Sequence, residues 1–242
     1  MQPTEDYRRS HLERGDSYDA LLANTPFDAY MAEWESRHLA EIVHRLFPTG
    51  VPRYLDFACG TGRVTSVVAP LSKASAAVDI SPSMIQVARE KLTTTTFHLC
   101  DLTKNKLDIG RFDLITSFRF FGNAQDELRD DAMGAIVERL VPGGYLVINS
   151  HRNPRALYAI LDRLTGGSAG MMDLHLDKLR RLLSAHGLRI VQMRPIGAWM
   201  FRSRLLNRYR ADDPVAVANE RRFGHSALSG IAPDVVVVAQ RA

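Results

Sequence analysis

Short apolar runs alternate with segments of helical periodicity along most of the chain. The apolar runs predict strands near residues 53–58, 75–79, 95–100, 112–117 and 144–149. The periodic segments predict helices near residues 63–71, 82–92, 125–140 and 174–186. Strands that alternate with helices form mostly parallel sheets that are covered on both faces. The pattern therefore predicts an α/β fold, a three-layer αβα sandwich.

The two ends of the chain depart from this alternation. Between Phe27 and Phe47 apolar residues recur at helical spacing, which predicts an amphipathic helix before the first strand. Near the other end, residues 188–193 and 235–239 have the composition of strands and are separated by irregular, arginine-rich sequence. We expect these two strands to pair antiparallel at one edge of the sheet.

The chain has 242 residues, of which 45% are hydrophobic and 24% charged. This length and composition fit one α/β domain, and no shift of composition marks a boundary. We expect a single domain with an N-terminal helical cap (1–50), a central core (51–194), an arginine-rich insert (195–233) and a last strand (234–242).

Composition also limits the classes of protein that fit. No run approaches the ~18 apolar residues of a membrane span, and the start of the chain lacks a signal pattern, so we expect a soluble, cytoplasmic protein. The two cysteines and eight histidines show no metal-ligand spacing, so we expect no metal site. The net charge of +4 is a small excess over the whole chain and does not by itself favour nucleic acid.

A glycine turn follows the first predicted strand, in Asp56-Phe57-Ala58-Cys59-Gly60-Thr61-Gly62-Arg63. Glycine permits positive φ angles and lets a ligand approach the main chain. A dinucleotide fingerprint needs a third glycine or alanine, and Val64 and Thr65 stand there instead, which disfavours NAD. An ordinary strand-to-helix turn is the alternative interpretation of this segment.

Two carboxylates at the ends of later strands favour a nucleoside-containing ligand. Asp79 ends the second predicted strand, where a carboxylate can accept hydrogen bonds from both ribose hydroxyls. Asp79 can also help to cap the next helix, although Ser81 is better placed for that role. Asp101 and Leu102 follow the third strand, where a carboxylate and a backbone amide can bind an adenine edge.

Together these segments resemble the class I S-adenosylmethionine-dependent methyltransferases. The resemblance covers residues 53–150 and rests on the glycine turn at 55–62, on Val78-Asp79-Ile80-Ser81-Pro82-Ser83-Met84-Ile85, on Phe112-Asp113-Leu114-Ile115 and on residues 140–148. It implies a seven-stranded sheet with a reversed last strand, S-adenosyl-L-methionine as cofactor, and a cofactor site across the carboxyl ends of the first strands.

The resemblance also implies roles for individual residues. Asp56, Ala58 and Gly60 would surround the methionine part of the cofactor, Asp79 would hold the ribose, and Asp101 with Leu102 would flank the adenine. Met84 would lie under the adenine, with a purely structural place in the second helix as the alternative. The complete expected cofactor site is Asp56, Ala58, Cys59, Gly60, Thr61, Gly62, Asp79, Ile80, Met84, Asp101, Leu102 and Ser117.

The methyl acceptor is expected near residues 117–123 and 149–153, which follow the fourth and fifth strands. Phe118, Phe120 and Phe121 surround Arg119, an arrangement that suits an acceptor with ring and acidic parts. His151 is the preferred general base because histidine titrates near neutral pH, although a histidine hydrogen-bonded in a loop is the alternative. His175 and Tyr30 are the next candidate catalytic residues.

The insert between Pro195 and Pro233 is rich in arginine and aromatic residues. Its arginines suit a lid or docking surface for an acidic acceptor such as a phosphorylated lipid-linked sugar, a carrier protein or RNA. A solvated cover over the edge strands is the favoured alternative. The residues concerned are Arg202, Arg204, Arg208, Arg210, Arg221, Arg222, Trp199, Phe201 and Tyr209, with Asp212, Asp213 and Glu220 as acidic partners.

We therefore expect a methyltransferase that acts on an O or N atom of a small molecule, with a sugar or glycolipid as the favoured acceptor. An acidic or phosphorylated acceptor also fits, and both a monomer and a homodimer stay open. An RNA methyltransferase is the enzyme alternative, although the chain has no Asn-Pro-Pro-Tyr-like motif and no cysteine placed for catalysis after the fourth or fifth strand. A nucleotide-binding Rossmann-type protein without methyl transfer is the alternative from another class.

Overall fold

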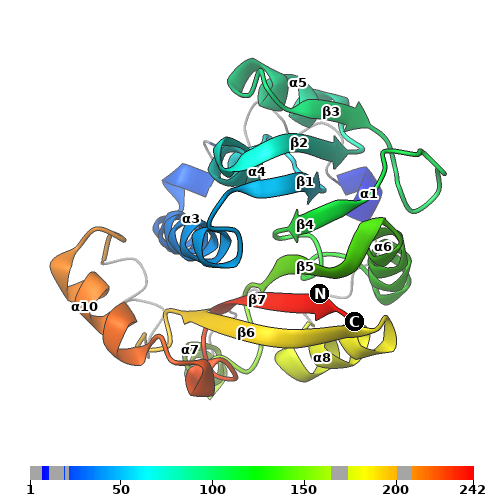
Figure 1. Ribbon diagram of the computed structural model, residues 1–242. Helices are drawn as coiled ribbons and strands as arrows, with labels where there is room; N and C mark the ends of the chain where they lie inside the picture. Colours follow the sequence, from blue (N-terminus) through cyan, green and yellow to red (C-terminus); the bar gives the residue numbers. More distant parts are fainter. Residues whose placement is uncertain (1–6, 11–18, 20–21, 165–173, 201–208) are drawn as a thin grey trace.

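Seven strands form one sheet in the computed structural model, which describes the chain except for residues 1–6, 11–18, 20–21, 165–173 and 201–208. The strand order is β3-β2-β1-β4-β5-β7-β6 (Figure 1). The strands are β1 (Val51–Phe57), β2 (Ser72–Asp79), β3 (Thr96–Leu99), β4 (Phe112–Ser117), β5 (Leu140–Ser150), β6 (Leu188–Ile196) and β7 (Asp234–Arg241). All five strands predicted for the core are present, within a few residues of the expected bounds.

The sheet is parallel from β3 to β5 and antiparallel where β7 joins it. β7 lies between β5 and β6 and pairs antiparallel with both, for example through Ile148↔Val237 and Met193↔Val237. The predicted antiparallel edge and reversed last strand are therefore confirmed. β1 pairs with β2 on one side and with β4 on the other, so the chain reverses its direction of winding there. Ligands of such sheets bind at this point, outside the carboxyl ends of the strands.

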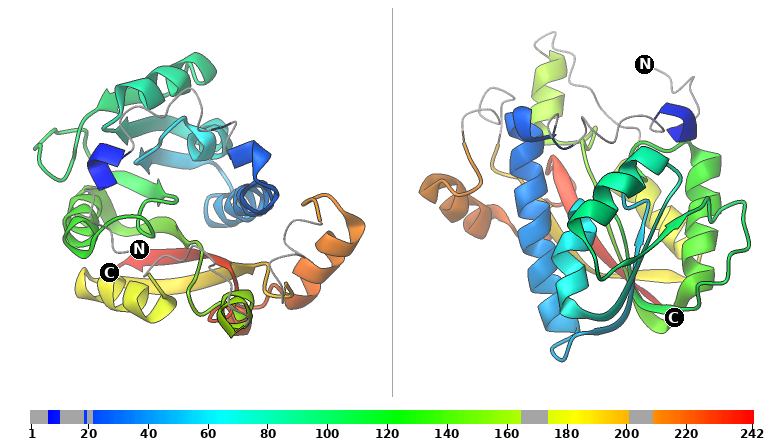
Figure 2. Two further views of the ribbon diagram at one scale, coloured as in Figure 1. Left: turned by 180° about the vertical axis from the view of Figure 1, so that it is seen from behind. Right: turned by 90° about the horizontal axis from the view of Figure 1, so that it is seen from above.

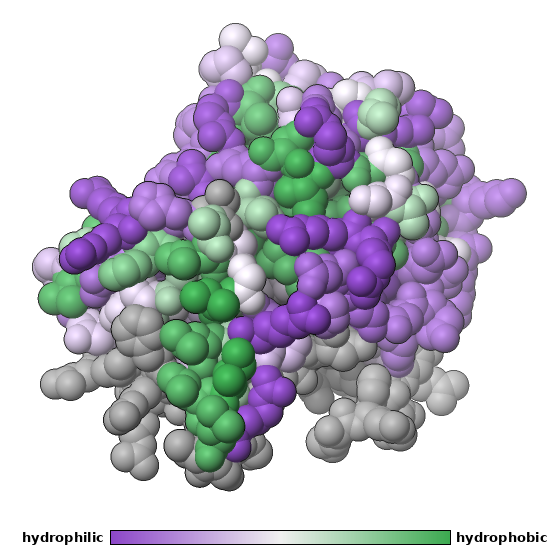
Figure 3. Space-filling model, turned by 90° about the horizontal axis from the view of Figure 1, so that it is seen from below, coloured by the Kyte–Doolittle hydropathy of each residue, from purple (hydrophilic) through white to green (hydrophobic). Residues whose placement is uncertain are grey.

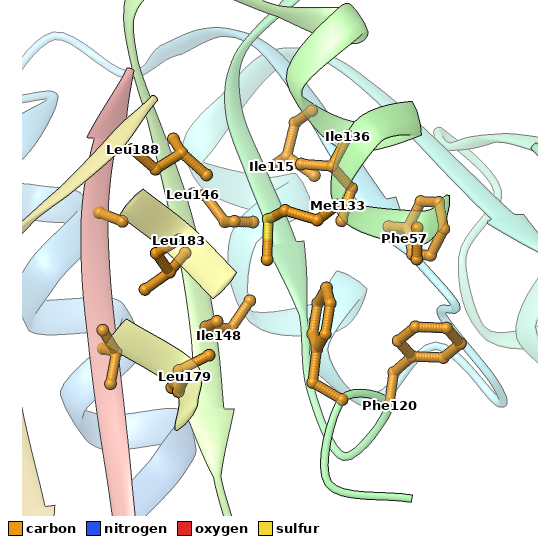
Figure 4. Packing of buried hydrophobic residues seen from close by; sticks show 14 of the residues in the cluster. Phe57, Ile115, Phe120, Met133, Ile136, Leu146, Ile148, Leu179, Leu183 and Leu188 are labelled. Atoms are coloured by element: carbon orange, nitrogen blue, oxygen red, sulfur yellow. The ribbon is translucent and has the colours of Figure 1, made fainter. Parts of the chain in front are cut away.

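Helices cover both faces of the sheet, as the alternating pattern predicts (Figure 2). The long α3 (Pro26–Leu46) and the short α4 (Arg63–Val68) pack with one face through a cluster that includes Leu39, Val64 and Val147. On the other face lie α6 (Asp126–Arg139) and α8 (Leu176–Ala185), whose buried side chains meet those of β4 and β5. Figure 4 shows Met133 and Ile136 beside Ile115 and Leu146, with Leu179 and Leu183 nearby.

The remaining elements lie around this core. They are α1 (Tyr7–Ser10), α5 (Pro82–Lys91), α7 (Leu157–Leu164), α10 (Pro214–Phe223) and the 3-10 turns η1 (Ala69–Leu71) and η2 (Ser226–Leu228). Sequence patterning predicted α5 but missed α7 and α10. The insert is therefore not wholly irregular: α10 begins with Pro214 in its first turn and is capped by Asp213, whose side chain accepts a hydrogen bond from Val215 N at 2.8 Å.

The insert is also less solvated than expected, because Glu220 of α10 is buried. Its Oε1 accepts hydrogen bonds from Tyr30 Oη at 2.7 Å, Gly197 N at 2.8 Å and Trp199 Nε1 at 3.1 Å. These contacts attach α10 to α3 and to the end of β6. Arg202, Arg204, Arg208 and Phe201, which were part of the predicted docking surface, lie outside the described residues.

Apolar side chains gather on the outside of α7, on the face shown in Figure 3. Ile160, Leu161 and Leu164 of this helix are 40%, 37% and 77% exposed, whereas Tyr158 and Ala159 on its other side are buried. Among the helices that the structure describes, none combines the length and the apolar character that a membrane crossing needs.

Candidate active site

A cavity opens at the carboxyl ends of β1, β2 and β4, where the winding of the sheet reverses. Its volume is about 990 Å³, including open solvent. Residues at the strand ends and in the loops that follow them line the cavity. Ten of the twelve predicted cofactor residues line this one cavity: Asp56, Ala58, Cys59, Gly60, Thr61, Asp79, Ile80, Met84, Asp101 and Leu102. Gly62 and Ser117 do not, although both lie in segments that border it.

The glycine turn between β1 and α4 has left-handed backbone at three residues: Ala58 (φ 58), Gly60 (φ 54) and Gly62 (φ 80). At Gly60 a side chain would meet only the Met84 sulfur, 4.0 Å away, so the main chain there faces open space. Gly62 caps α4 and packs closely against Leu92 and Ala88. The two glycines therefore have different roles: Gly60 gives access to the backbone and Gly62 permits packing.

Asp79 joins the glycine turn to the end of β2. Its two carboxylate oxygens accept hydrogen bonds from Gly60 N at 2.8 Å and from Ser81 N at 2.9 Å. Burial raises the pKa of Asp79, while these backbone donors act against the rise. Each carboxylate oxygen has a second lone pair, so the fixed side chain can still accept hydrogen bonds from two hydroxyl groups in the cavity.

Asp56 at the end of β1 is held by hydroxyl groups from two elements. Thr116 Oγ1 donates to one carboxylate oxygen at 2.8 Å and Thr65 Oγ1 donates to the other at 2.6 Å. Burial raises the pKa of Asp56 to about 6. The side chain ties β1 to β4 and α4 and puts a titratable carboxyl group at the floor of the cavity.

The far end of the cavity lies beyond β3, at Asp101. Thr103 Oγ1 and Thr103 N donate to one oxygen of Asp101 at 2.6 and 3.0 Å, and Arg8 Nε donates to the other at 2.9 Å. Arg8 belongs to α1, whose Tyr7 ring packs edge-on against Phe120 at 5.7 Å. Both α1 residues line the cavity. Sequence patterning missed them because no local motif links residues 7–8 to the core.

The loop after β4 is the other side of the cavity. Phe118, Arg119 and Phe120 line the cavity, in agreement with the predicted apolar wall that carries one cation. Phe121 was expected in the same wall but is fully buried in the core. Arg119 has a positive φ of 57, and its backbone N–H donates to Asn149 Oδ1 at 2.6 Å. Its guanidinium lies 3.4 Å from Glu35 and donates to the Asp28 carbonyl at 3.2 Å.

The three predicted catalytic residues do not lie together. His151 follows β5 and is buried, and burial together with the Arg119 charge lowers its pKa to about 3. His175 caps α8 by accepting a hydrogen bond from Lys178 N at 3.3 Å. Tyr30 donates to Glu220 beneath the insert, and burial raises its pKa. None of the three lines the cavity. Of the three, His151 is the one affected by the charge of Arg119, which does line the cavity.

Comparison with known proteins identifies the class to which this fold and cavity belong. Residues 55–144, which include the glycine turn, Asp79 and Asp101, match the family model described as "Methyltransferase domain". The fold of the chain, with its seven-stranded sheet, is that of the class I S-adenosylmethionine-dependent methyltransferases. The methyl donor of this class is S-adenosylmethionine.

Particular relatives include enzymes with different acceptors. The magnesium-protoporphyrin O-methyltransferase of Rhodobacter capsulatus is 28% identical over 152 residues, which span 53% of this chain and 66% of that relative. The N-methyltransferase NodS of Bradyrhizobium japonicum, solved with S-adenosyl-L-homocysteine, has a TM-score of 0.61 at 20% identity, with 98% of both chains covered. CalS10, an amino pentose methyltransferase of Micromonospora echinaspora solved with S-adenosylmethionine, has a TM-score of 0.57 at 18% identity, covering 86% of this chain and 90% of that one.

Proposed function

We propose that the protein transfers a methyl group from S-adenosylmethionine to an O or N atom of a small molecule. The observation that carries the proposal is the pairing of Asp79 with the Gly60 backbone N–H at the mouth of an open glycine turn. This pairing fixes a carboxylate for the ribose and leaves the turn accessible to the rest of the donor. The residues present therefore fit the donor.

The residues that line the cavity support a proposed position for each part of the donor. Asp79 at the end of β2 would hold the ribose, and Asp101 with Leu102 beyond β3 would flank the adenine. Asp56, Ala58 and Gly60 at the end of β1 would surround the methionine part, as the order of the strands suggests. Met84 lies 4.0 Å from the position that a Gly60 side chain would occupy, so it is placed to contact a ligand there.

When bound, S-adenosylmethionine supplies an electrophilic methyl group on a positively charged sulfur. The chain must then orient an acceptor atom in line with the S–CH₃ bond and exclude water. Phe118 and Phe120 supply an apolar wall where the loop after β4 lines the cavity. The ring of Tyr7 in α1 packs edge-on against the Phe120 ring. These rings support a small acceptor with an apolar face.

The names of the relatives support the acceptor proposal. One relative is an O-methyltransferase, another an N-methyltransferase and a third acts on an amino pentose. We therefore favour a small acceptor with hydroxyl or amino groups, and a sugar or glycolipid is the first class to test. The alternative of RNA gains no support from the described part of the insert, in which Glu220 is buried and α10 packs against α3.

His151 stays the candidate proton acceptor for the transfer. Its ring is neutral at pH 7, and Nδ1 has no hydrogen-bond partner among the described residues. The lowered pKa makes it a weak base, so it suits an acceptor whose proton leaves only as the new bond to carbon forms.

The proposal is tested by incubating the protein with methyl-labelled S-adenosylmethionine and a panel of sugars, glycolipids and amino sugars. We expect transfer of label to one class of acceptor, and a drop in kcat of about 100-fold in His151→Ala with an unchanged dissociation constant for S-adenosylhomocysteine. His186→Ala is the matched control, because the lost ring makes its hydrogen bond to Asp130, at 2.8 Å, outside the site. Unchanged turnover in His151→Ala removes this residue from the mechanism, and label that reaches only RNA refutes the proposed acceptor class.

A further inference from the structure

The short helix α7 presents its most apolar side to the surface of the molecule. Four aliphatic side chains, here called the apolar stripe, stand at the spacing i, i+3, i+4 and i+7: Leu157, Ile160, Leu161 and Leu164. In a globular protein a stripe with this spacing faces the core. Here Ile160 and Leu164 are 40% and 77% exposed, whereas Tyr158 and Ala159, which lie off the stripe, are buried. The stripe is therefore on the outer side of α7 (Figure 3).

The helix lies at the same edge of the sheet as the cavity. The loop that leads to α7 leaves the carboxyl end of β5, which runs parallel to β4. Arg152 of this loop lies 3.1 Å from Asp28 of α3, and the ring centroids of Tyr158 and Phe27 are 6.1 Å apart. In the right-hand view of Figure 2, α7 extends beyond the sheet at the end where α1 lies, and α1 lines the cavity. The apolar stripe and the cavity thus share one end of the molecule.

Basic side chains lie around the apolar stripe. Residues 152–164 contain three arginines and one acidic residue, and α8 contains three basic residues and one acidic residue. Arg155 and Arg180 both pair with Asp177, which joins the start of α8 to the residues just before α7. Arg163 of α7 and Arg181 of α8 are exposed. The surroundings of the stripe therefore carry an excess of positive charge.

The size of the stripe and this charge argue against a second copy of the chain as its partner. Each partner of a stable dimer buries about 800 Å² of surface. The helix has only 8 residues and Leu157 is already half-buried, so the stripe supplies a small part of that area. In a symmetric dimer the same patch lies on both sides of the contact, so the arginines of the two copies would repel one another.

A lipid surface with anionic headgroups fits the same features. An amphipathic helix can lie in the plane of a bilayer surface, with its apolar side among the upper parts of the acyl chains. Arginines beside such a helix are attracted by anionic headgroups, and each of them strengthens the binding. No second protein surface is needed, so one short helix can be sufficient for reversible binding.

We propose that α7 docks the protein on bilayer surfaces that contain anionic lipid. Ile160 and Leu164 enter the apolar layer, and Arg155, Arg163 and Arg181 contact the headgroups. This docking goes beyond methyl transfer and does not depend on it. Because the cavity lies at the same end of the molecule, docking also brings the proposed acceptor site near the lipid, which suits the glycolipid class of acceptor under the proposed function.

Sedimentation of the full-length protein with two kinds of vesicle tests the inference. One kind is phosphatidylcholine alone, and the other is phosphatidylcholine and phosphatidylglycerol in equal parts. We expect binding to the anionic vesicles that weakens at high salt, and binding to the neutral vesicles at least about 10-fold weaker. The double variant Ile160→Gln/Leu164→Gln should lose about 10-fold or more in affinity for the anionic vesicles. Arg163→Gln/Arg181→Gln should lose at least about 5-fold.

Leu99→Gln is the matched control, because Leu99 is 53% exposed but belongs to β3 at the opposite edge of the sheet. It should bind the anionic vesicles within about 2-fold of the unmodified protein. All the substituted side chains are exposed, so equal melting temperatures should exclude unfolding as the cause of a loss. Absence of vesicle binding, equal binding to both kinds of vesicle, or unchanged binding in Ile160→Gln/Leu164→Gln overturns the inference. A dimer seen by analytical ultracentrifugation that dissociates in this variant, without vesicle binding, overturns it in favour of a second copy.

Discussion

Several ionisable side chains of this protein are buried at or near the candidate site. Glu35, Asp56, Asp234, Arg119 and His151 are all at least 92% buried, and most lie at the carboxyl edge of the sheet. Removing one member of such a group leaves its partner charged and unpaired, which costs several kcal/mol. Substitutions here must therefore be read with ligand-specific controls, because loss of folding and loss of binding give the same loss of activity.

Burial of His38 in α3 makes the free energy of unfolding depend on pH. Its two ring nitrogens are buried without hydrogen-bond partners among the described residues, and burial, with the Arg194 charge, lowers its pKa from 6.5 to about 4. The folded protein therefore favours the neutral ring. Stability from this term is fully present above pH 6.5 and is lost as the pH falls to about 4, because the unfolded chain binds the proton first.

We expect His38→Phe to remove about 3 kcal/mol of this acid sensitivity, since the ring can keep its packing against Trp34. Urea unfolding of both proteins between pH 7 and pH 4.5 measures the change. His44→Phe on the same helix, where the histidine is exposed, should leave the pH dependence of the unmodified protein unaltered. If His38→Phe loses as much stability between pH 7 and pH 4.5 as the unmodified protein does, His38 is not the source of the acid sensitivity.

At single residues, sequence patterning predicted most of the residues that line the cavity and missed charged residues whose partners are distant in sequence. Gly60, Asp79 and Asp101 stand at fixed places after successive strands, so local patterns were enough to predict them. Arg8 was missed because its partner Asp101 is 93 residues away, and Glu35 because its partner Asn149 is 114 residues away. Such pairs become visible only when the fold brings the segments together.

At the scale of elements, the strands were predictable and two helices were not. Apolar runs such as Leu146–Ile148 and Val235–Val238 are buried on both faces of the sheet, which makes their apolar signal continuous. α7 and α10 are short helices of 8 and 10 residues that follow loops, and neither belongs to the alternation of strand and helix. The Asp213-Pro214 pair was the local signal for α10, because it caps the first turn.

A substitution at Gly62 tests how much the contact between the glycine turn and α5 contributes to stability. In Gly62→Ala the new methyl group would lie 3.0 Å from Leu92 Cδ1 and 3.2 Å from Ala88 Cβ, at a φ of +80. We expect a loss of about 2–4 kcal/mol in the free energy of unfolding, from backbone strain and from displacement of α5. Thermal or urea unfolding measures it.

Gly187→Ala is the matched control for this turn. Its φ of +72 imposes the same kind of backbone strain, but no atom lies within 4 Å of the added methyl group. It should lose only about 1–2 kcal/mol. Equal losses in the two variants would show that the contact between the glycine turn and α5 contributes nothing.

At the scale of the whole molecule, the sheet brings together residues that lie far apart along the chain. β1 has β2 on one side and β4 on the other, so the loops after all three strands open into one cavity. Helices on both faces hold the strands, and α1 and α3 add Arg8 and Glu35 from outside the matched domain. The seven strands and the reversed last strand were predictable from the resemblance, whereas the contribution of α1 to the lining of the cavity was not.

Titration of the protein with S-adenosylhomocysteine in a calorimeter tests whether this cavity is a donor site for methyl transfer. We expect one site per chain, a raised melting temperature, and an affinity about 10- to 100-fold weaker in Asp79→Asn. Asp131→Asn, an exposed acid on α6, should bind as the unmodified protein does. Absence of binding, or stabilisation by NADH but not by S-adenosylhomocysteine, would contradict the claim.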